Sequence, residues 1–222
     1  MNGSQTIHFT YLGDLLGISS LYRASQDNAY NSLNHFYNTV FTYLEPYYKK
    51  RGVNVRMFSD SLIVTGPDPV AFIQTMAPIY IKLLSDGLML RGVMVHGKLE
   101  NERRVTRKNF QKFLPIDDSL ARAAWLEKQV KGCRLIVEDA LKAKMRRGGC
   151  DTLPLREVEL GSRMVCHDVL YPAMVLKSRC DGPWVAGGRD VEQLLTELEG
   201  KRDEAGEEHR KHYDDTIKLF SL

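Results

Sequence analysis

The sequence predicts an α+β fold, with a mixed sheet flanked by helices, in a single domain that spans residues 1–222. Segments with the two-residue alternation of strands and segments with helical periodicity follow one another along the chain, and no segment is repeated. The chain is also long enough to bury a core unaided. We expect the core of the domain at about 6–180 and a C-terminal helical segment at about 188–220.

The first elements predicted are a strand, a long helix and a hairpin. Residues 6–18 read as a strand that runs into a glycine-containing turn, and residues 19–50 have the apolar spacing of a helix. Residues 53–58 and 61–66 then read as two strands joined by a tight turn. This hairpin carries Asp60 at its tip.

The remaining elements alternate in the same way and end in a long helix weakened by two glycines. In chain order they are a helix over 69–87, a strand over 88–100, a basic loop or hairpin over 100–112, a helix over 117–130, a strand over 133–139, a short helix over 140–149, two or three strands over 156–177, and a helix over 190–220 that contains Gly200 and Gly206.

The composition narrows the classes of protein. A net charge of +3 is too small to indicate a nucleic-acid partner. The four cysteines form no CxxC pair, which argues against a structural zinc site and fits a reducing compartment. The N-terminus lacks the pattern of a secretory signal, and no apolar run approaches the roughly 20 residues that a membrane span needs. We therefore expect a cytoplasmic protein without a membrane or nucleic-acid partner.

Two acids carry the first chemical prediction. Asp14 ends the first predicted strand, and Asp60 lies at the tip of the hairpin. If these strands are neighbours, both carboxylates lie at one edge of the sheet, where such hard oxygen ligands suit Mg²⁺ or Mn²⁺ together with substrate phosphates. The alternative is that both are solvated turn residues, because aspartate is common in turns.

The segment between these acids predicts a phosphate site. Gly17, Ile18 and Ser19 lie directly before or at the start of the first predicted helix. The first N–H groups of a helix have no partner within it and bind phosphate groups. Carboxylates beside such a segment indicate a nucleoside triphosphate as the ligand.

Four segments together resemble the catalytic domains of class III nucleotide cyclases. They occur in the order of that family and span about residues 6–139. The segments are "YLGDLLGIS", which resembles F-x-D-I-x-G-F-T; "RMFSDSLIV", which resembles the K-x-x-G-D-x-x-M hairpin; "LRGVMVHGKL", which resembles R-x-G-I-x-x-G; and "DDSLARAAWLEK" with "GCRLIVED", which resemble G-x-x-V-N-x-A-A-R-L-E and G-x-I-x-V-S.

This resemblance implies a ferredoxin-like palm that works as a head-to-tail homodimer with composite active sites. It implies that Asp14, Asp60 and the backbone carbonyl of Leu15 hold two Mn²⁺ or Mg²⁺ ions per site. The reaction implied is attack of the ribose 3′-oxygen on the α-phosphorus with release of pyrophosphate, and two metal ions suit both the attacking and the leaving oxygen. Arg91 of the third segment is a candidate to line the site or a solvated strand residue.

The position that reads the base departs from the purine cyclases. Arg56 stands where adenylate cyclases carry Lys and guanylate cyclases Glu, and the second base-reading position falls near Leu114. Arginine only donates hydrogen bonds and leucine accepts none, so this pair favours a base with acceptor groups. Uracil fits best, which predicts UTP as substrate and CTP as the alternative. Arg56 could equally be an exposed strand residue.

The residue that stabilises the transition state is predicted from a shifted alignment. The family's Asn and Arg fall on Ala121 and Trp125, whereas a shift of about one turn gives Asp118 and Arg122, four residues apart on one helix face. A guanidinium suits the charged pentavalent phosphorus, so we predict Arg122 as the catalytic residue. The alternative is a surface ion pair.

The chain most resembles the short cyclases of bacterial Pycsar anti-phage systems, through "FSDSLIV", "LRGVMVHGKL" and its compact length. That resemblance implies a uridylate cyclase whose product, cyclic UMP, activates an effector protein. The alternatives are a cytidylate cyclase or an inactive palm that only binds a nucleotide or a partner protein. The sequence does not indicate the trigger or the effector.

Overall fold

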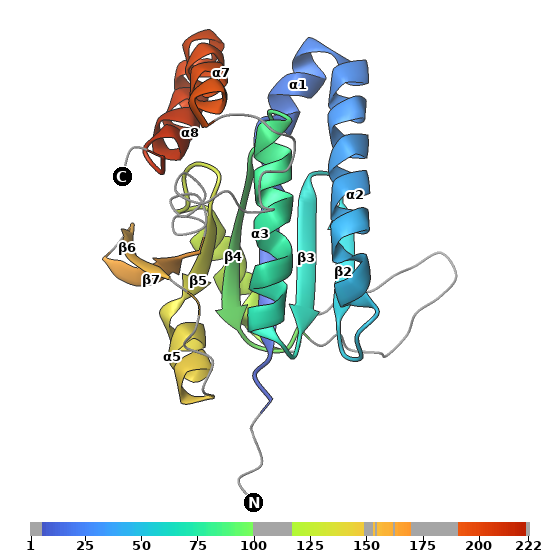
Figure 1. The fold of residues 1–222 in the computed structure, drawn as a ribbon, viewed down its shortest axis with the longest axis vertical. Coiled ribbons are helices and arrows are strands. Elements are labelled where there is room, and N and C mark those ends of the chain that lie inside the picture. The colour runs from blue at the N-terminus through green and yellow to red at the C-terminus, as the bar shows by residue number, and fades with distance from the viewer. Residues whose placement is uncertain are drawn as a thin grey trace, which may run out of the picture.

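A computed structural model describes residues 6–99, 117–148, 153, 155–161, 163–169 and 191–220. Its centre is a seven-stranded sheet of order β2-β3-β1-β4-β5-β7-β6 (Figure 1). The strands are β1 (Phe9–Leu15), β2 (Asn54–Phe58), β3 (Ser61–Gly66), β4 (Leu90–His96), β5 (Leu135–Glu138), β6 (Arg156–Leu160) and β7 (Met164–Asp168).

The sheet is mixed, as predicted. Strands β4 and β5 are parallel, and every other neighbouring pair is antiparallel. The first strand of the chain, β1, lies between β3 and β4, so its residues are paired on both sides. At its carboxyl end, Asp14 lies opposite Ser61 of β3 and Arg91 of β4.

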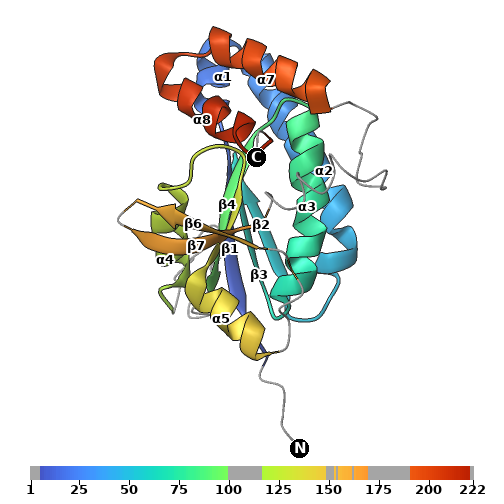
Figure 2. The ribbon, with the colours of Figure 1, turned by 60° about the vertical axis from the view of Figure 1, so that its left-hand side comes forward.

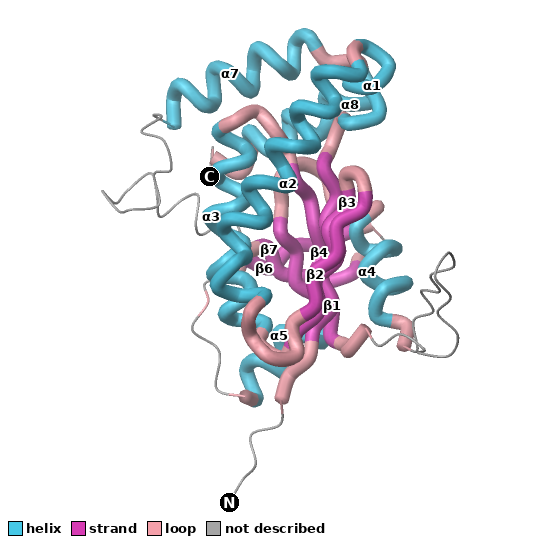
Figure 3. Tube along the Cα trace, turned by 90° about the vertical axis from the view of Figure 1, so that its right-hand side faces the viewer, coloured by secondary structure: helices cyan, strands magenta, loops and turns pink. Residues whose placement is uncertain are grey.

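Helices cover both faces of this sheet. Helices α2 and α3 lie on one face and α4 on the other (Figure 3). The helices are α1 (Ile18–Ala24), α2 (Gln26–Tyr48), α3 (Pro69–Ser85), α4 (Ser119–Glu127), α5 (Asp139–Arg147), α7 (Val191–Glu204) and α8 (Glu207–Ile217). Together with the sheet, they confirm the predicted α+β class. None of the helices in the described parts of the chain has the length and apolar character needed to cross a membrane.

Two expected helices are each divided into two. The helix predicted over residues 19–50 breaks at Ser25, which has an extended backbone and accepts a hydrogen bond from the Asn28 amide as the N-cap of α2. The C-terminal helix breaks at Ala205–Gly206, whereas Gly200 continues α7. Of the strands predicted over residues 156–177, β6 and β7 are found, and residues 170–177 lie outside the described part.

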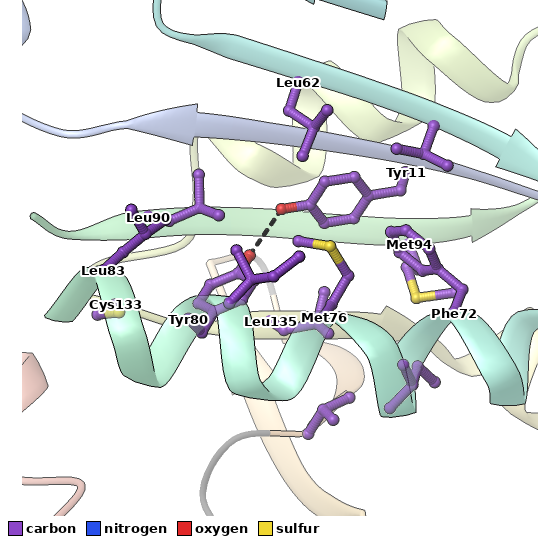
Figure 4. Close-up of a cluster of buried hydrophobic side chains, with 14 of the residues drawn as sticks. Tyr11, Leu62, Phe72, Met76, Tyr80, Leu83, Leu90, Met94, Cys133 and Leu135 are labelled. Carbon is purple, nitrogen blue, oxygen red and sulfur yellow. Dashed lines mark hydrogen bonds between the residues drawn. The ribbon is translucent and has the colours of Figure 1, made fainter. Parts of the chain in front are cut away.

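The larger core lies between the sheet and helices α2 and α3, and Tyr11 of β1 is at its centre (Figure 4). Its hydroxyl is 2.8 Å from that of Tyr80 on α3, where either group can donate the hydrogen bond. Gly13 and Gly92 face each other across β1 and β4, and a Cβ atom at either would overlap the Tyr11 ring. The absence of a side chain at these two glycines therefore leaves space for the Tyr11 ring near the carboxyl end of β1.

Helices α7 and α8 pack against the end of the sheet at which β1 finishes, beside α1 (Figure 2). Leu198 and Leu219 are buried in the larger core. Ser20 Oγ of α1 and His209 Nε2 of α8 are 2.8 Å apart, and the buried Thr216 hydroxyl accepts a hydrogen bond of 2.9 Å from the Cys133 amide. The C-terminal helices are thus fixed to the segments that surround this end of the sheet.

Candidate functional site

The two predicted acids lie together at the carboxyl end of β1. Asp60 occupies the turn between β2 and β3, where Ser59 has a positive φ of 52°. The Leu15 amide donates a hydrogen bond of 2.9 Å to the Asp60 carbonyl, which fixes the turn against the residue that follows Asp14. Asp60 is therefore a hairpin residue, not an interior strand residue, and its backbone adjoins β1.

The electrostatics of Asp14 reflect this crowding. Burial, followed by the negative charges of Asp60 and Glu127, raises the pKa of Asp14 to about 6, while Arg91 acts in the opposite direction. A carboxyl group whose charged form is disfavoured by another carboxylate gains when a cation binds between them. The side chain keeps 28% of its surface exposed, so a cation has access to it.

The donor set fits Mg²⁺ or Mn²⁺. Two carboxylates and a backbone carbonyl are hard oxygen ligands, and these cations retain water and bind substrate phosphates to complete their coordination. Within the described ranges, no group of three or more His, Cys, Asp or Glu side chains is arranged to hold a metal by itself. Asp14, Asp60 and the Leu15 carbonyl would therefore hold the ions jointly with the nucleotide.

Two further charged side chains, Arg91 and Glu127, belong to this end of the sheet. Arg91 projects from β4 beside Asp14, with Nη2 at 3.4 Å from Asp14 Oδ2, and its Nε contacts Oε1 of Glu127 at the end of α4. Its Nη1 is 3.5 Å from the Val130 carbonyl. The sequence suggested Arg91 as a site residue but not Glu127, which lies within the segment "DDSLARAAWLEK". The feature of the sequence that could have identified Glu127 is an acidic residue on the apolar side of a short helix.

The predicted phosphate segment begins α1. Gly17 is the N-cap at φ 85°, a conformation that favours glycine, and its carbonyl accepts the first helical hydrogen bond from Leu21. Ile18 is buried and Ser19 is exposed. The amides of Ile18 and Ser19 thus stand in the first turn, although α1 has only seven residues rather than the long helix expected.

Helix α8 reaches the same end of the sheet. His212 Nδ1 accepts a hydrogen bond of 3.2 Å from the Gly132 amide, in the turn that follows α4. Burial and the positive charge of Arg91 lower the pKa of His212 to about 4. A neutral His212 is what this hydrogen bond requires, because a protonated Nδ1 cannot accept.

Arg56, the predicted base-reading residue, lies on β2 opposite Ile63 of β3. Its neighbours Val55 and Met57 pack on the larger core, so by strand alternation Arg56 and the exposed Phe58 project from the other face. Burial lowers the pKa of the Arg56 guanidinium. The second base-reading position, Leu114, lies outside the described residues.

Arg122 is at the opposite end of the sheet from the two acids. Its Nε donates to Asp118 Oδ1 at 3.1 Å, so the predicted pair on α4 is present. The other guanidinium nitrogens contact Glu138 Oε1 and the His96 carbonyl. Since His96 is five residues along β4 from Arg91, Arg122 lies about 17 Å from Asp14 along the strand. One protomer does not bring Arg122 to the acids.

The alternative alignment positions point away from the sheet. Ala121 is exposed, and Trp125 keeps 47% of its surface exposed, whereas Arg122 between them turns towards β4 and β5. The outward face of α4 therefore carries an alanine and a tryptophan at the positions where the family has Asn and Arg.

No protein-family model and no curated protein sequence matches the chain. Several solved structures do match the chain. A Trypanosoma brucei adenylate cyclase in its monomeric state has a TM-score of 0.59 at 10% identity, covering 76% of this chain and 90% of that one. The adenylyl cyclase CyaB from P. aeruginosa has a TM-score of 0.53 at 16% identity, covering 74% and 94%.

A guanylate cyclase domain from Catenaria anguillulae, solved in complex with GTP, also matches, with a TM-score of 0.53 at 10% identity and coverage of 73% and 94%. These proteins share the mixed sheet flanked by helices that the sequence predicts for this chain. The chain has the fold of the class III nucleotide cyclase catalytic domains.

Proposed function

We propose that the chain is a nucleotide cyclase that converts UTP to 3′,5′-cyclic UMP and pyrophosphate, as a homodimer with two composite active sites. The observation that carries this proposal is the placement of Asp14 and Asp60 together at one edge of a cyclase-type sheet. The mutual repulsion of the two carboxylates, with the partial exposure of Asp14, supports a cation site at this edge.

In the proposed reaction a bond forms between the ribose 3′-oxygen and the α-phosphorus, the bond between that phosphorus and the pyrophosphate oxygen breaks, pyrophosphate departs, and the 3′-hydroxyl proton passes to solvent water. Asp14, Asp60 and the Leu15 carbonyl would hold two Mn²⁺ or Mg²⁺ ions, which when bound would supply charge neutralisation for the reaction. The amides of Ile18 and Ser19, beside Gly17, bind the triphosphate.

The distance between Arg122 and the acids supports a composite site. Arg122 serves the reaction only if a second copy brings it to the acids of the first, as a head-to-tail dimer does. The face that carries Arg56 and the exposed Phe58 and Trp125 offers apolar contact area for that second copy. Arg122 of the partner subunit would then stabilise the charge on the phosphorus.

The choice of UTP rests on Arg56. A donor-only side chain suits a base whose exocyclic groups accept hydrogen bonds, and uracil presents two such carbonyls whereas cytosine presents one carbonyl and one amino group. Cyclic UMP formed in this way would serve as a messenger that activates an effector protein in anti-phage defence.

The test is turnover of the four nucleoside triphosphates by the purified chain with Mn²⁺, with products resolved by chromatography and identified by mass. We expect cyclic UMP as the main product and pyrophosphate in equal amount. A main product of cyclic CMP would select the cytidylate alternative, and one from ATP or GTP would contradict the pyrimidine assignment. No turnover, with the fold intact, would indicate an inactive palm.

The defence role has a separate test in cells. Bacteria that express the chain should accumulate cyclic UMP after phage infection, and bacteria that express the Asp60→Ala variant at the same level should not. Mass spectrometry of cell extracts measures both. Equal cyclic UMP levels before and after infection would contradict a response to phage while leaving the cyclase activity intact.

A further inference from the structure

A single guanidinium is shared between two carboxylates at the proposed cation site. Arg91 contacts Glu127 through Nε, whereas its Nη2 is 3.4 Å from the nearest oxygen of Asp14. The third nitrogen, Nη1, faces the Val130 carbonyl at 3.5 Å. The contact with Glu127 is therefore the shorter of the two ion pairs, and the one with Asp14 is at the outer limit of a hydrogen bond.

Because these groups are largely buried, it matters which carboxylate pairs with Arg91. The Glu127 side chain is 9% exposed and that of Arg91 15%, whereas Asp14 keeps 28% of its side-chain surface exposed. Buried charges are retained only when they are paired. Arg91 must therefore keep a carboxylate partner, and the two described carboxylates that contact it are Asp14 and Glu127.

Glu127 adds a third acid to an end of the sheet that already carries Asp14 and Asp60. It makes the site more negative, and it is among the groups that raise the pKa of Asp14. No group of three acids in the described parts of the chain is placed to bind one metal together. The position of Glu127 is explained instead by its contact with Arg91.

We propose that Glu127 is a positioning residue that holds the Arg91 guanidinium back from Asp14, so that the Asp14 carboxylate remains available to a divalent cation. This inference rests on the proposed function, since it concerns the same cation site. Without the charge of Glu127, the buried Arg91 has Asp14 as its remaining contacting carboxylate. The Asp14–Arg91 pair then tightens, and a cation must displace it before binding.

The experiment measures Mn²⁺ binding to the full chain without nucleotide, by calorimetry and by the loss of the free Mn²⁺ paramagnetic resonance signal. Glu127→Gln keeps the size of the side chain and removes its charge, and it should weaken Mn²⁺ binding by about tenfold, within the usual range of coupling between two ligands of one protein. The double variant Arg91→Gln/Glu127→Gln lacks the competing guanidinium and should bind Mn²⁺ at least as tightly as the unmodified chain.

Glu138→Gln is the matched control, because Glu138 is also a partly buried acid paired with an arginine, at the other end of the sheet. It should leave Mn²⁺ binding unchanged. Unchanged binding by Glu127→Gln would overturn the inference, and so would a double variant as weak as the single one, which is the behaviour of a direct ligand. If the single variant does not fold, the double variant decides alone, and weaker binding than that of the unmodified chain overturns the inference.

The two proposals fail in different ways. If the unmodified chain neither binds Mn²⁺ nor turns over UTP, the proposed function and this inference are both overturned. If it turns over UTP but binds no Mn²⁺ without nucleotide, only this inference is overturned. If it binds Mn²⁺ and turns over UTP while Glu127→Gln binds Mn²⁺ normally, only the role of Glu127 is overturned.

Discussion

The two ends of β1 differ in how their charges are paired. At the carboxyl end, Asp14 shares one guanidinium with Glu127, and the described residues offer the Asp60 carboxylate no ion pair. At the amino end, Arg122 is engaged by Glu138, Asp118 and the His96 carbonyl. The first end has acids in need of positive charge, and the second has a cation that two acids already engage but that keeps 34% of its side-chain surface exposed.

This difference indicates how the proposed reaction is divided between two copies. Acids with too few cationic partners at one end suit the metal ions and triphosphate, while at the other end the contacts of Arg122 hold its helix, α4, against β4 and β5. A catalytic group that is fixed in place before it meets the substrate costs no reorganisation during the reaction. The comparison can be tested at each end separately.

The largest effect is expected from Asp60→Ala at the acidic end. Removal of a ligand shared by the metal ions should lower UTP turnover by about 10³-fold or more, because the charge on the leaving pyrophosphate is no longer neutralised. Turnover under saturating Mn²⁺ measures the loss, and circular dichroism checks the fold. Activity within tenfold of the unmodified chain would remove Asp60 from the site.

A smaller loss, of about 10²-fold, is expected from Arg122→Ala at the other end, as is usual when one group that stabilises transition-state charge is removed. Mixing it with Asp60→Ala sharpens the comparison. In a head-to-tail dimer, a mixed pair has one intact site and one doubly altered site, so an equal mixture should recover about a quarter of full activity.

The recovery also controls for folding, because Arg122→Ala must supply an intact Asp60 to the shared site. A mixture no more active than its components would mean that Arg122 and Asp60 do not serve one composite site.

The pH dependence of Mn²⁺ binding tests the end of β1 that carries Asp14. Because burial and neighbouring acids raise the pKa of Asp14 to about 6, protons compete with Mn²⁺ below that pH. Mn²⁺ affinity should fall by up to about tenfold per pH unit as the pH drops from 6 to 5. Calorimetry in matched buffers measures this, and an affinity that is flat across this range would contradict a role for Asp14 as ligand.

Without metal the same group affects stability. A raised pKa means that the folded chain binds a proton between about pH 4 and 6 that the unfolded chain has released, so Asp14 lowers stability as the pH rises through that window. When the pH is lowered from 7 to 5, the Tm of the metal-free chain should therefore rise relative to the Tm of the Asp14→Asn variant.

The smallest effect is expected from Arg56→Gln, which replaces a donor-only side chain by one that also accepts. UTP should be bound a few-fold less tightly and CTP a few-fold better, because the amide can accept from the cytosine amino group. The ratio of kcat/KM for the two substrates measures the change. An unaltered ratio would show that Arg56 does not face the base.

Much of the fold followed from local signals in the sequence. The hairpin with Asp60 at its tip was predicted because two strand patterns flank two polar residues, and α3 because prolines and a glycine mark its ends. The break at Ser25 was missed, since the apolar spacing of α1 continues into α2 and hides the N-cap. The order of the strands depends on contacts far apart in the chain, which periodicity does not encode.

The site was predicted in part for the same reason. Asp14 and Asp60 end neighbouring strands, so their meeting follows from the hairpin and the sheet edge. The contacts of Arg122 with Glu138 and of Arg91 with Glu127 join residues 16 and 36 positions apart, on different elements. Such pairs appear only when the helix is placed on the sheet.

The central position of β1 also has a consequence for synthesis on the ribosome. Residues 9–15 are made before their partner on one side, β4, which is complete only at residue 96. At roughly 5–20 residues per second, a strand that carries Phe9 and Tyr11 waits about 4–16 s for that partner. During that interval β1 has no β4 to pair with, and the sheet cannot close around it.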